Sequence, residues 1–277
     1  MQYFQRFDPA PIEVLLCDAD GNLFPSEEPA FDASVGVTNR FLQRFGLPAE
    51  RTATELRQQT TGKNFRTTAV DLAVEGGVPI EATLAVGRSK AIVASADEID
   101  SRRALTSAEL EKWVAEERQV VTSHLGVTLR PDPHVFGPLE MLSRRFRLAA
   151  VSSSASARLT ACFRATELDL LMPSDVRFSA EDSLPVPTSK PDPAVYTFAG
   201  AVLGINGNQG LAVEDAVPGV ASAVAAGFVT FGNVVFVPPE ERARRVHDLR
   251  QAGACAVIES WHDLEEVLTS MVPVGQG

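Results

Sequence analysis

The sequence lacks long basic runs, clustered histidines and an acyl-hydrolase GxSxG motif, and each absence excludes a class of protein. Acidic side chains (36) outnumber basic ones (25) among its 277 residues, which gives a net charge of −11 at pH 7. No lysine or arginine run offsets this charge locally, so we expect no nucleic-acid partner. The four histidines show no spacing typical of metal ligands.

Cysteine is also scarce. Cys17, Cys162 and Cys255 are odd in number and form no CxxC pair. This usage is typical of buried free thiols in a reducing compartment, not of a disulfide framework or a zinc site. The first six residues contain no basic region followed by an apolar core, so we expect no signal peptide. These features predict a cytoplasmic protein.

One long stretch without charge could be mistaken for a membrane span. Residues 216–237 contain no charged side chain and are numerous enough to cross a bilayer. However, Pro218 and several glycines interrupt the stretch, which favours a buried helix over 218–226, a turn at Gly227 and a buried strand over 228–232. We therefore expect no membrane association.

Short apolar runs that alternate with helical segments predict the fold class. Such runs occur at residues 12–17, 147–151, 210–213, 228–231 and 256–258. The alternation is typical of an α/β domain with a Rossmann-like, mostly parallel sheet. In sheets of this kind, ligands bind beyond the carboxyl ends of the strands.

The region from about residue 25 to 130 differs, because helical spacing recurs there and no convincing strand appears. We expect helices over residues 35–45, 54–59, 65–74, 79–94 and 107–125. Pro131 and Pro133 would end the last helix and stiffen the connection that follows. The sequence thus predicts an α/β core formed by residues 1–24 and 131–277, with an inserted all-helical domain formed by residues 25–130.

Two aspartates follow the first apolar run. Asp18 and Asp20 come directly after it, and Gly21 then allows the backbone to turn sharply. Alternate side chains of an extended segment share a face, so both carboxylates start on the same side. Such a pair suits a divalent cation, a nucleophile or an acid/base pair. The alternative is a solvated turn whose aspartates cap neighbouring backbone groups.

Further polar groups follow later predicted strands or loops, namely Ser152, Lys190, Glu214 and Asp215. Together with the two aspartates, they supply the groups that phosphoryl transfer requires. A carboxylate can attack phosphorus, a second can move a proton to the leaving oxygen, and others can hold Mg²⁺. A hydroxyl and an ammonium can bind the phosphoryl oxygens. For Ser152 alone the alternative is a helix N-cap, since residues 155–163 look helical.

In this order the motifs resemble those of the haloacid dehalogenase-like hydrolase superfamily, and of its β-phosphoglucomutase-like branch in particular. The matching segments are Asp18-Ala19-Asp20-Gly21, Val151-Ser152-Ser153-Ser154, Ser189-Lys190-Pro191-Asp192-Pro193 and Val213-Glu214-Asp215-Ala216-Val217-Pro218-Gly219-Val220. The resemblance covers roughly residues 12–22 and 131–235. That branch carries a helical cap between its first two motifs, where this chain has its insertion.

The resemblance implies a role for each matched residue. Asp18 would be the nucleophile that forms an aspartyl-phosphate, and Asp20 would be the general acid/base. Ser152 would hydrogen-bond the transferring phosphoryl group, and Lys190 would bridge that group and the nucleophile. Members that dehalogenate or cleave phosphonates lack the second aspartate, so the presence of Asp20 favours a phosphatase or a mutase.

The resemblance also implies a metal site. Asp215, assisted by Glu214, would hold Mg²⁺ together with the Asp18 carboxylate and the Asp20 backbone carbonyl. Separately from the resemblance, we expect a small phosphorylated metabolite as the substrate and a monomer or homodimer as the working form. The sequence departs from the common pattern at Asn22, where Thr or Val is usual. Other departures are Ala216 in place of Ser and Pro25 in place of Asp.

Three further residues are candidate substrate-binding groups. Ser153 belongs to the second motif. Lys63 and Arg66 lie at a glycine-containing break between predicted helices, where the family's caps carry a loop that selects the substrate. A surface helix start is the alternative interpretation of this break.

We therefore expect a Mg²⁺-dependent phosphatase that acts on a small phosphomonoester, such as a sugar phosphate. A phosphomutase that uses the same aspartyl-phosphate is the alternative within the class. A non-catalytic sensor of a phosphorylated ligand on the same fold is the alternative outside it, and the intact acidic residues argue against this sensor.

Overall fold

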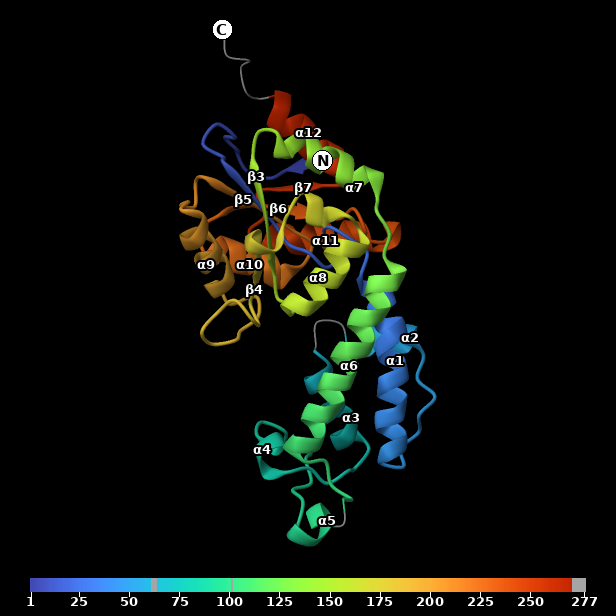
Figure 1. Cartoon of the computed structure of the whole chain (residues 1–277). Helices are drawn as coiled ribbons and strands as arrows, with labels where there is room; N and C mark the ends of the chain where they lie inside the picture. Colours follow the sequence, from blue (N-terminus) through green and yellow to red (C-terminus); the bar gives the residue numbers. More distant parts are fainter. Residues whose placement is uncertain (61–63, 101, 271–277) are drawn as a thin grey trace. The chain divides into compact units, whose positions relative to one another are not determined.

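The computed structural model describes residues 1–60, 64–100 and 102–270. The chain divides into two compact units (Figure 1). The first unit comprises Met1–Ser26 and Gly126–Gly277, and the second comprises Glu27–Leu125.

The first unit is built on one seven-stranded sheet with the order β1-β7-β6-β5-β2-β3-β4. The strands are β1 (Gln2–Tyr3), β2 (Val14–Cys17), β3 (Arg147–Ser152), β4 (Arg177–Ser179), β5 (Gly210–Glu214), β6 (Val229–Asn233) and β7 (Ala256–Ile258). Only β1 runs antiparallel, against β7, and the other described strands pair in parallel. The expected Rossmann-like parallel sheet with an inserted helical region is confirmed.

Helices cover both faces of this sheet (Figure 1). They are α7 (Pro133–Ser143), α8 (Ser156–Ala165), α9 (Ala194–Leu203), α10 (Val217–Ala225), α11 (Pro239–Gln251) and α12 (Trp261–Ser270), with short 3₁₀ turns at Leu168–Leu170 and Ser174–Val176. On one face, Val14 and Leu16 of β2 share a core with Val195 of α9 and Ala223 of α10. Leu15 lies on the other face by the alternation of a strand and is also fully buried, which explains the continuous apolar run.

The second unit is helical. Its elements are α1 (Glu27–Arg44), α2 (Ala53–Thr60), α3 (Phe65–Glu75), α4 (Ala82–Ala85), α5 (Ala96–Asp100) and α6 (Ser107–Thr128), the last of which extends past the boundary of the unit. Phe41 of α1, Val70 of α3 and Leu110 of α6 belong to one buried apolar cluster, which holds these three helices together. Asn64 caps α3, because its side chain accepts a hydrogen bond of 2.9 Å from the N–H of Thr67.

The helix expected over residues 79–94 is wrong. Only Ala82–Ala85 is helical there, and Gly87 turns the chain with a φ of +78°. Ile80 instead forms isolated parallel bridges with Val93 and Leu105, and its side chain is fully buried. This segment is therefore a loop held by isolated β-bridges, although its apolar residues are spaced as in a helix.

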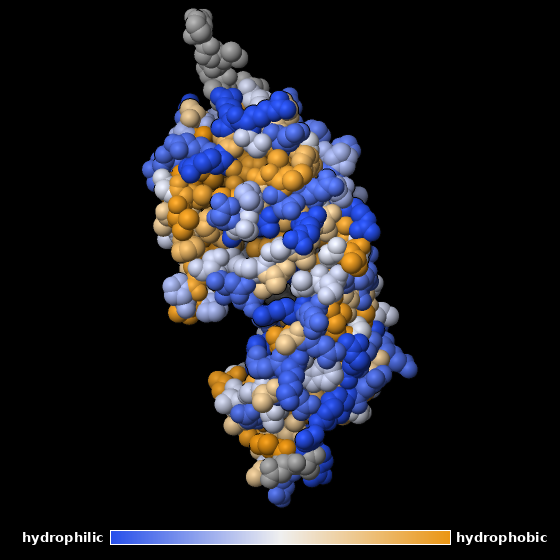
Figure 2. All heavy atoms as spheres, viewed as in Figure 1, coloured by the Kyte–Doolittle hydropathy of each residue, from blue (hydrophilic) through white to orange (hydrophobic). Residues whose placement is uncertain are grey.

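The uncharged stretch at residues 216–237 folds into α10, a turn at Gly227 and β6, as the sequence predicts. Within the described residues, no helix is both long and apolar enough to cross a membrane. Polar and apolar side chains both reach the surface (Figure 2), and the exposed apolar ones of the first unit include Leu170, Val186 and Val202.

Candidate active site

The carboxyl ends of three adjacent strands place the candidate residues close together. β2 lies between β3 and β5, with Cys17 opposite Ala150 on one side and Val213 on the other. Because the three strands run in parallel, Asp18, Ser152 and Glu214 all emerge at the same edge of the sheet. The backbone N–H of Asp18 extends the ladder by donating to the carbonyl of Val213 at 2.9 Å.

Lys190, from the loop that precedes α9, lies at the centre of this edge. Its Nζ donates to Oδ1 of Asp18 at 2.5 Å, to Oε1 of Glu214 at 2.5 Å and to the carbonyl of Val151 at 2.8 Å. Burial alone would lower the pKa of Lys190, but the charges of Asp18 and Glu214 outweigh it and raise that pKa. Lys190 is therefore a charged ammonium whose three hydrogens are all used.

Three carboxylates gather around this ammonium. One oxygen each of Asp18, Glu214 and Asp215 lies within 4.8 Å of the others. Burial and the neighbouring acids raise the pKa of Asp215 well above its ordinary value, and they raise the pKa of Glu214 to about 7. Lys190 and Arg245 both act on this cluster, but two cationic side chains do not balance three acidic ones, so the cluster favours an additional cation.

The donor set fits a hard divalent cation such as Mg²⁺, which prefers oxygen ligands. Gly21 leaves room for the Asp215 carboxylate, because a Cβ at position 21 would lie 2.4 Å from its Oδ2. Gly21 also adopts a φ of +76°, which residues with a side chain rarely tolerate. The turn after β2 is thus shaped to bring Asp215 beside Asp18.

Glu214 is enclosed more tightly than the other two acids. Its Oε1 accepts hydrogen bonds from Lys190 and from the hydroxyl of Tyr196 on α9. A Cβ at Gly219 would lie 1.8 Å from its Oε2, so α10 approaches the carboxylate at a position without a side chain. These contacts suit Glu214 for holding Lys190 in place more than for binding a metal through Oε1.

Asp20 belongs to a separate set of contacts. Its Oδ1 accepts hydrogen bonds from Ser26 at 2.5 Å and from Arg158 of α8 at 2.7 Å. Its Oδ2 accepts one from Ser154 at 2.6 Å. Burial alone would raise the pKa of Asp20, but the Arg158 charge and the hydroxyl donors lower it below its ordinary value. Asp18 and Asp20 are therefore adjacent acids with different cationic partners.

The serines of the second motif shape the same edge. Ser152 is buried, and its Oγ accepts a hydrogen bond of 3.0 Å from the N–H of Ser154. It does not cap α8, whose N-cap position is occupied by Ala155. The Oγ of Ser153 accepts from the backbone N–H of Lys190 at 3.1 Å, so this serine fixes the lysine loop. The expected contact of Ser153 with the substrate stays a prediction.

Sequence reasoning missed Tyr196 and Arg158. Tyr196 lies on an apolar helix and looked like an ordinary core aromatic, and only its contact with Glu214 distinguishes it. Arg158 had a weak signal, because a cation in the first turn of a helix opposes the helix dipole and needs a compensating partner.

The two residues predicted to select the substrate belong to the helical unit. Lys63 lies outside the described residues. Arg66, in the first turn of α3, donates to Oε2 of Glu111 at 2.7 Å in a two-pronged ion pair with α6. A role for either residue in binding substrate stays a prediction.

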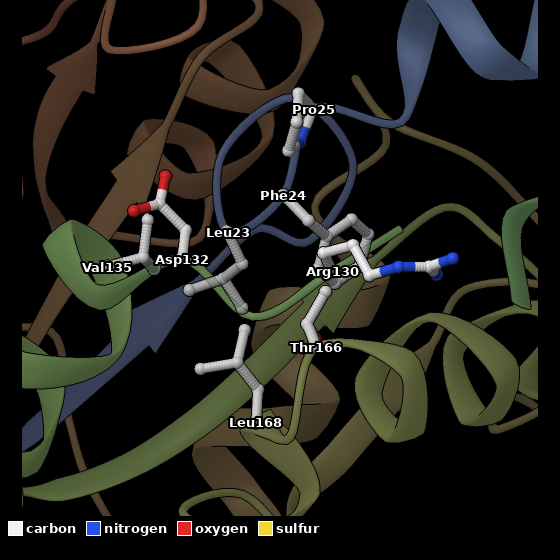
Figure 3. A pocket seen from close by; sticks show the side chains of 8 residues that line it. All are labelled: Leu23, Phe24, Pro25, Arg130, Asp132, Val135, Thr166 and Leu168. Atoms are coloured by element: carbon white, nitrogen blue, oxygen red, sulfur yellow. The ribbon is translucent and has the colours of Figure 1, made fainter. Parts of the chain in front are cut away.

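A small cavity lies where the chain leaves and re-enters the first unit (Figure 3). It has a volume of about 10 Å³, which is room for one water molecule. Its lining includes Phe24 and Pro25 on one connecting segment and Arg130 and Asp132 on the other. The cavity is too small for a metabolite and does not serve as the substrate site.

Three solved structures illustrate the similarity of this chain to known proteins. A HAD family hydrolase from Deinococcus radiodurans R1 with bound phosphate and sodium is 25% identical, with a TM-score of 0.58 over 95% of this chain and 97% of that one. A predicted phosphoglycolate phosphatase from Haemophilus somnus 129pt is 20% identical, with a TM-score of 0.65 over 93% and 98%. CbbY from Rhodobacter sphaeroides, in complex with xylulose-(1,5)bisphosphate, is 19% identical, with a TM-score of 0.60 over 91% and 96%.

The sequence matches no protein-family model and no curated protein. The structural neighbours are haloacid dehalogenase-like hydrolases, phosphoglycolate phosphatases and β-phosphoglucomutases, which match this chain over nearly its full length. The chain therefore has the haloacid dehalogenase-like fold, and the resemblance seen in the sequence motifs is confirmed at the level of the fold.

Proposed function

We propose that this protein is a Mg²⁺-dependent phosphatase that hydrolyses a small phosphomonoester, with sugar phosphates as the expected substrate class. The observation that carries the proposal is the contact of Lys190 with both Asp18 and Glu214 beside Asp215. This arrangement supports a role for Asp18 as the nucleophile, because its carboxylate lies next to a fixed positive charge at the edge of the sheet where ligands bind in folds of this kind. Structural neighbours with bound phosphate and with a bound sugar bisphosphate support the same chemistry.

In the first step, a carboxylate oxygen of Asp18 attacks phosphorus, and the bond between phosphorus and the ester oxygen breaks. Asp20 is ionised at rest, because Arg158 and the hydroxyl donors lower its pKa, so it first takes up a proton from solvent. It then gives this proton to the ester oxygen, and a neutral alcohol leaves. Lys190 offsets the charge that gathers between Asp18 and the phosphoryl group. The hydroxyl of Ser152 donates to a phosphoryl oxygen.

In the second step, water attacks the phosphorus of the aspartyl-phosphate. Asp20, now a carboxylate, takes a proton from this water, and the bond between phosphorus and Asp18 breaks. Inorganic phosphate leaves, Asp20 releases the proton to solvent, and both aspartates return to their starting states. One water molecule is consumed for each ester cleaved, and the side chains are regenerated.

Asp18, Asp215 and the backbone carbonyl of Asp20 would hold Mg²⁺. The bound cation supplies charge neutralisation at the phosphoryl oxygens. Glu214 contributes by fixing Lys190, because its Oε1 already accepts two hydrogen bonds.

The test is a phosphatase screen over sugar phosphates, nucleotides and phosphorylated three-carbon acids, with Mg²⁺ and with EDTA. We expect turnover that requires the cation and is lost in Asp18→Asn and in Asp20→Ala. Asp175→Asn is a matched control, because this aspartate is exposed on the same unit. Full activity in Asp18→Asn, or activity that EDTA leaves unchanged, would contradict the proposal.

A phosphomutase would share the first step and differ in the fate of the aspartyl-phosphate. The β-phosphoglucomutases among the structural neighbours favour this second candidate. A phosphatase releases inorganic phosphate and alcohol in equal amounts. A mutase instead converts the substrate to an isomer and releases little phosphate, so chromatography of the products together with a phosphate assay separates the two.

A further inference from the structure

Arg158 lies in the first turn of α8, where a positively charged side chain is unfavourable. It is the third residue of α8, where the exposed N–H groups of the first turn already carry partial positive charge. Its guanidinium donates to Oδ1 of Asp20 at 2.7 Å, and about a quarter of each side chain is exposed. The negative charge of Asp20 thus offsets the positive charge of Arg158 at the N-terminus of α8.

The two oxygens of Asp20 are held by donors from three places in the first unit. Ser26 and Arg158 donate to Oδ1, and Ser154 donates to Oδ2. Arg158 is the charged donor of this set, and it stands on a helix whose buried residues Leu159 and Phe163 anchor it to the core. A carboxylate held at both oxygens has little freedom to rotate toward the acids around Asp18.

The cations near the two aspartates are separate. The ammonium of Lys190 is fully used by Asp18, Glu214 and the carbonyl of Val151, so none of its hydrogens reaches Asp20. Lys190 therefore serves the nucleophile, and Arg158 serves the second aspartate. Asp18 and Asp20 both follow β2 and are separated by one residue, but their carboxylates are held by different cations.

We propose that Arg158 is a positioning residue, which orients the Asp20 carboxylate for proton transfer to the leaving oxygen. This inference rests on the proposed phosphatase function and names a residue outside the family motifs. Proton transfer depends steeply on alignment, and a group held by charge-assisted hydrogen bonds is aligned before substrate arrives. Arg158 does not need to touch the substrate to act in this way.

The consequence is a dependence on the leaving group. 4-Nitrophenolate leaves without help from an acid, whereas phenolate is a poorer leaving group that benefits from a proton. In Arg158→Met, we expect the first-turnover release of phenol from phenyl phosphate to slow about tenfold more than the release of 4-nitrophenol from 4-nitrophenyl phosphate. Arg158→Lys, which keeps the charge, should lie between Arg158→Met and the wild type.

The measurement is rapid-quench kinetics with enzyme in excess and Mg²⁺ present, because the first turnover isolates cleavage of the ester from hydrolysis of the aspartyl-phosphate. Arg164→Met is the matched control, since this arginine is exposed on the same helix and should keep the wild-type ratio of the two rates. A general loss of folding or packing would slow both esters equally. If Arg158→Met does not fold, Arg158→Lys carries the same comparison.

Equal slowing of both esters in Arg158→Met, or wild-type rates for both, would overturn the role of Arg158 while leaving the phosphatase assignment intact. Phosphatase activity that survives in Asp18→Asn, or none in the wild type, would instead overturn the proposed function and the role of Arg158 with it. A larger loss for phenyl phosphate in Arg158→Met, absent in Arg164→Met, supports the inference.

Discussion

The side-chain amide of Asn233, at the end of β6, donates a hydrogen bond of 2.8 Å to Oδ1 of Asn22 in the turn after β2. Both side chains are completely buried. The Nδ2 of Asn22 in turn donates to the carbonyls of Asp18 at 2.8 Å and Val213 at 3.2 Å. Because two carbonyls accept from Asn22, its Nδ2 must face them, which fixes the orientation of both amides.

These hydrogen bonds give a physical role to Asn22, which stands where the resembled superfamily usually has Thr or Val. The side-chain amide of Asn22 ties the turn after β2 to the end of β5 and, through Asn233, to the end of β6. Replacing Asn233 by Ala leaves the Asn22 oxygen without this donor in a buried site. We expect the free energy of unfolding to fall by about 1–3 kcal/mol.

Chemical denaturation followed by circular dichroism measures this loss. Asn208→Ala is the control, because Asn208 is exposed, and it should change the free energy of unfolding by less than about 0.5 kcal/mol. The double variant Asn22→Ala with Asn233→Ala should lose less than the sum of the two single variants, since the two amides share one network. Strict additivity would show that the pair is not coupled.

Tyr196 supports Lys190 through Glu214, because both side chains donate a hydrogen bond to the same carboxylate oxygen. In Tyr196→Phe, Glu214 loses one of the two donors to its Oε1 and nothing is added. We expect the free energy of unfolding to fall by about 1–2 kcal/mol, in the range for hydrogen bonds to charged groups. We also expect turnover to fall, because Lys190 is held less firmly. Tyr3→Phe is the same change at an exposed tyrosine and should leave both quantities unchanged.

Gly219 is the position at which α10 passes the Glu214 carboxylate. A methyl group there would lie 1.8 Å from Oε2, so Gly219→Ala must displace the carboxylate that holds Lys190. We expect turnover to fall about tenfold or more, since small displacements at a reacting centre are costly. Gly137→Ala in α7 is the control, because a Cβ there meets nothing within 4 Å. It should stabilise its helix by about 0.5–1 kcal/mol and keep full activity.

The start of α12 provides a prediction about pH. Ser260 and Asp263 form a capping box, in which Oδ2 of Asp263 accepts from the N–H of Ser260 at 3.2 Å and from that of Glu259 at 2.9 Å. Burial alone would raise the pKa of Asp263, but these hydrogen bonds lower it below its ordinary value of 3.8.

A lowered pKa means that ionised Asp263 stabilises the fold at neutral pH and that this contribution is lost as the pH falls below 3.8. Asp263→Ala should therefore reduce the free energy of unfolding by about 1 kcal/mol at pH 7. The difference from the wild type should shrink as the solution becomes more acidic. Glu266→Ala, an exposed acid on the same helix, should show no such dependence. A difference that stays constant with pH would contradict the capping role.

Much of the fold could be predicted because the central strands are apolar on both faces. β2 is fully buried in all its residues, so its sequence is an unbroken apolar run. β1 and β4 were missed because two or three residues carry too little pattern to be noticed. The error at residues 79–94 arose because bridges made by Ile80 override a local helical spacing, and long-range pairing of this kind leaves no local signal.

The candidate site could also be predicted only in part. That Asp18 and Glu214 lie together could be predicted, because strand ends in a parallel sheet converge on one edge. Lys190 lies in the loop before α9, and only the resemblance of its motif placed it beside them. The hydrogen bonds that hold the acidic residues in place could not be predicted, because their donors include side chains of helices packed against the sheet. Arg158 and Asp20 are 138 positions apart in the sequence, and only the docking of α8 brings them into contact.

The central claim is that Asp18 becomes covalently phosphorylated during turnover. The most direct measurement is an acid quench during steady-state hydrolysis of a sugar phosphate with Mg²⁺, followed by proteolysis and mass spectrometry of the peptide that contains Asp18 and Asp20. We predict a phosphoryl group on Asp18 in the wild type and none in Asp18→Asn. A phosphoryl group on another residue, or its absence from Asp18 while the substrate is being hydrolysed, would contradict the proposed mechanism.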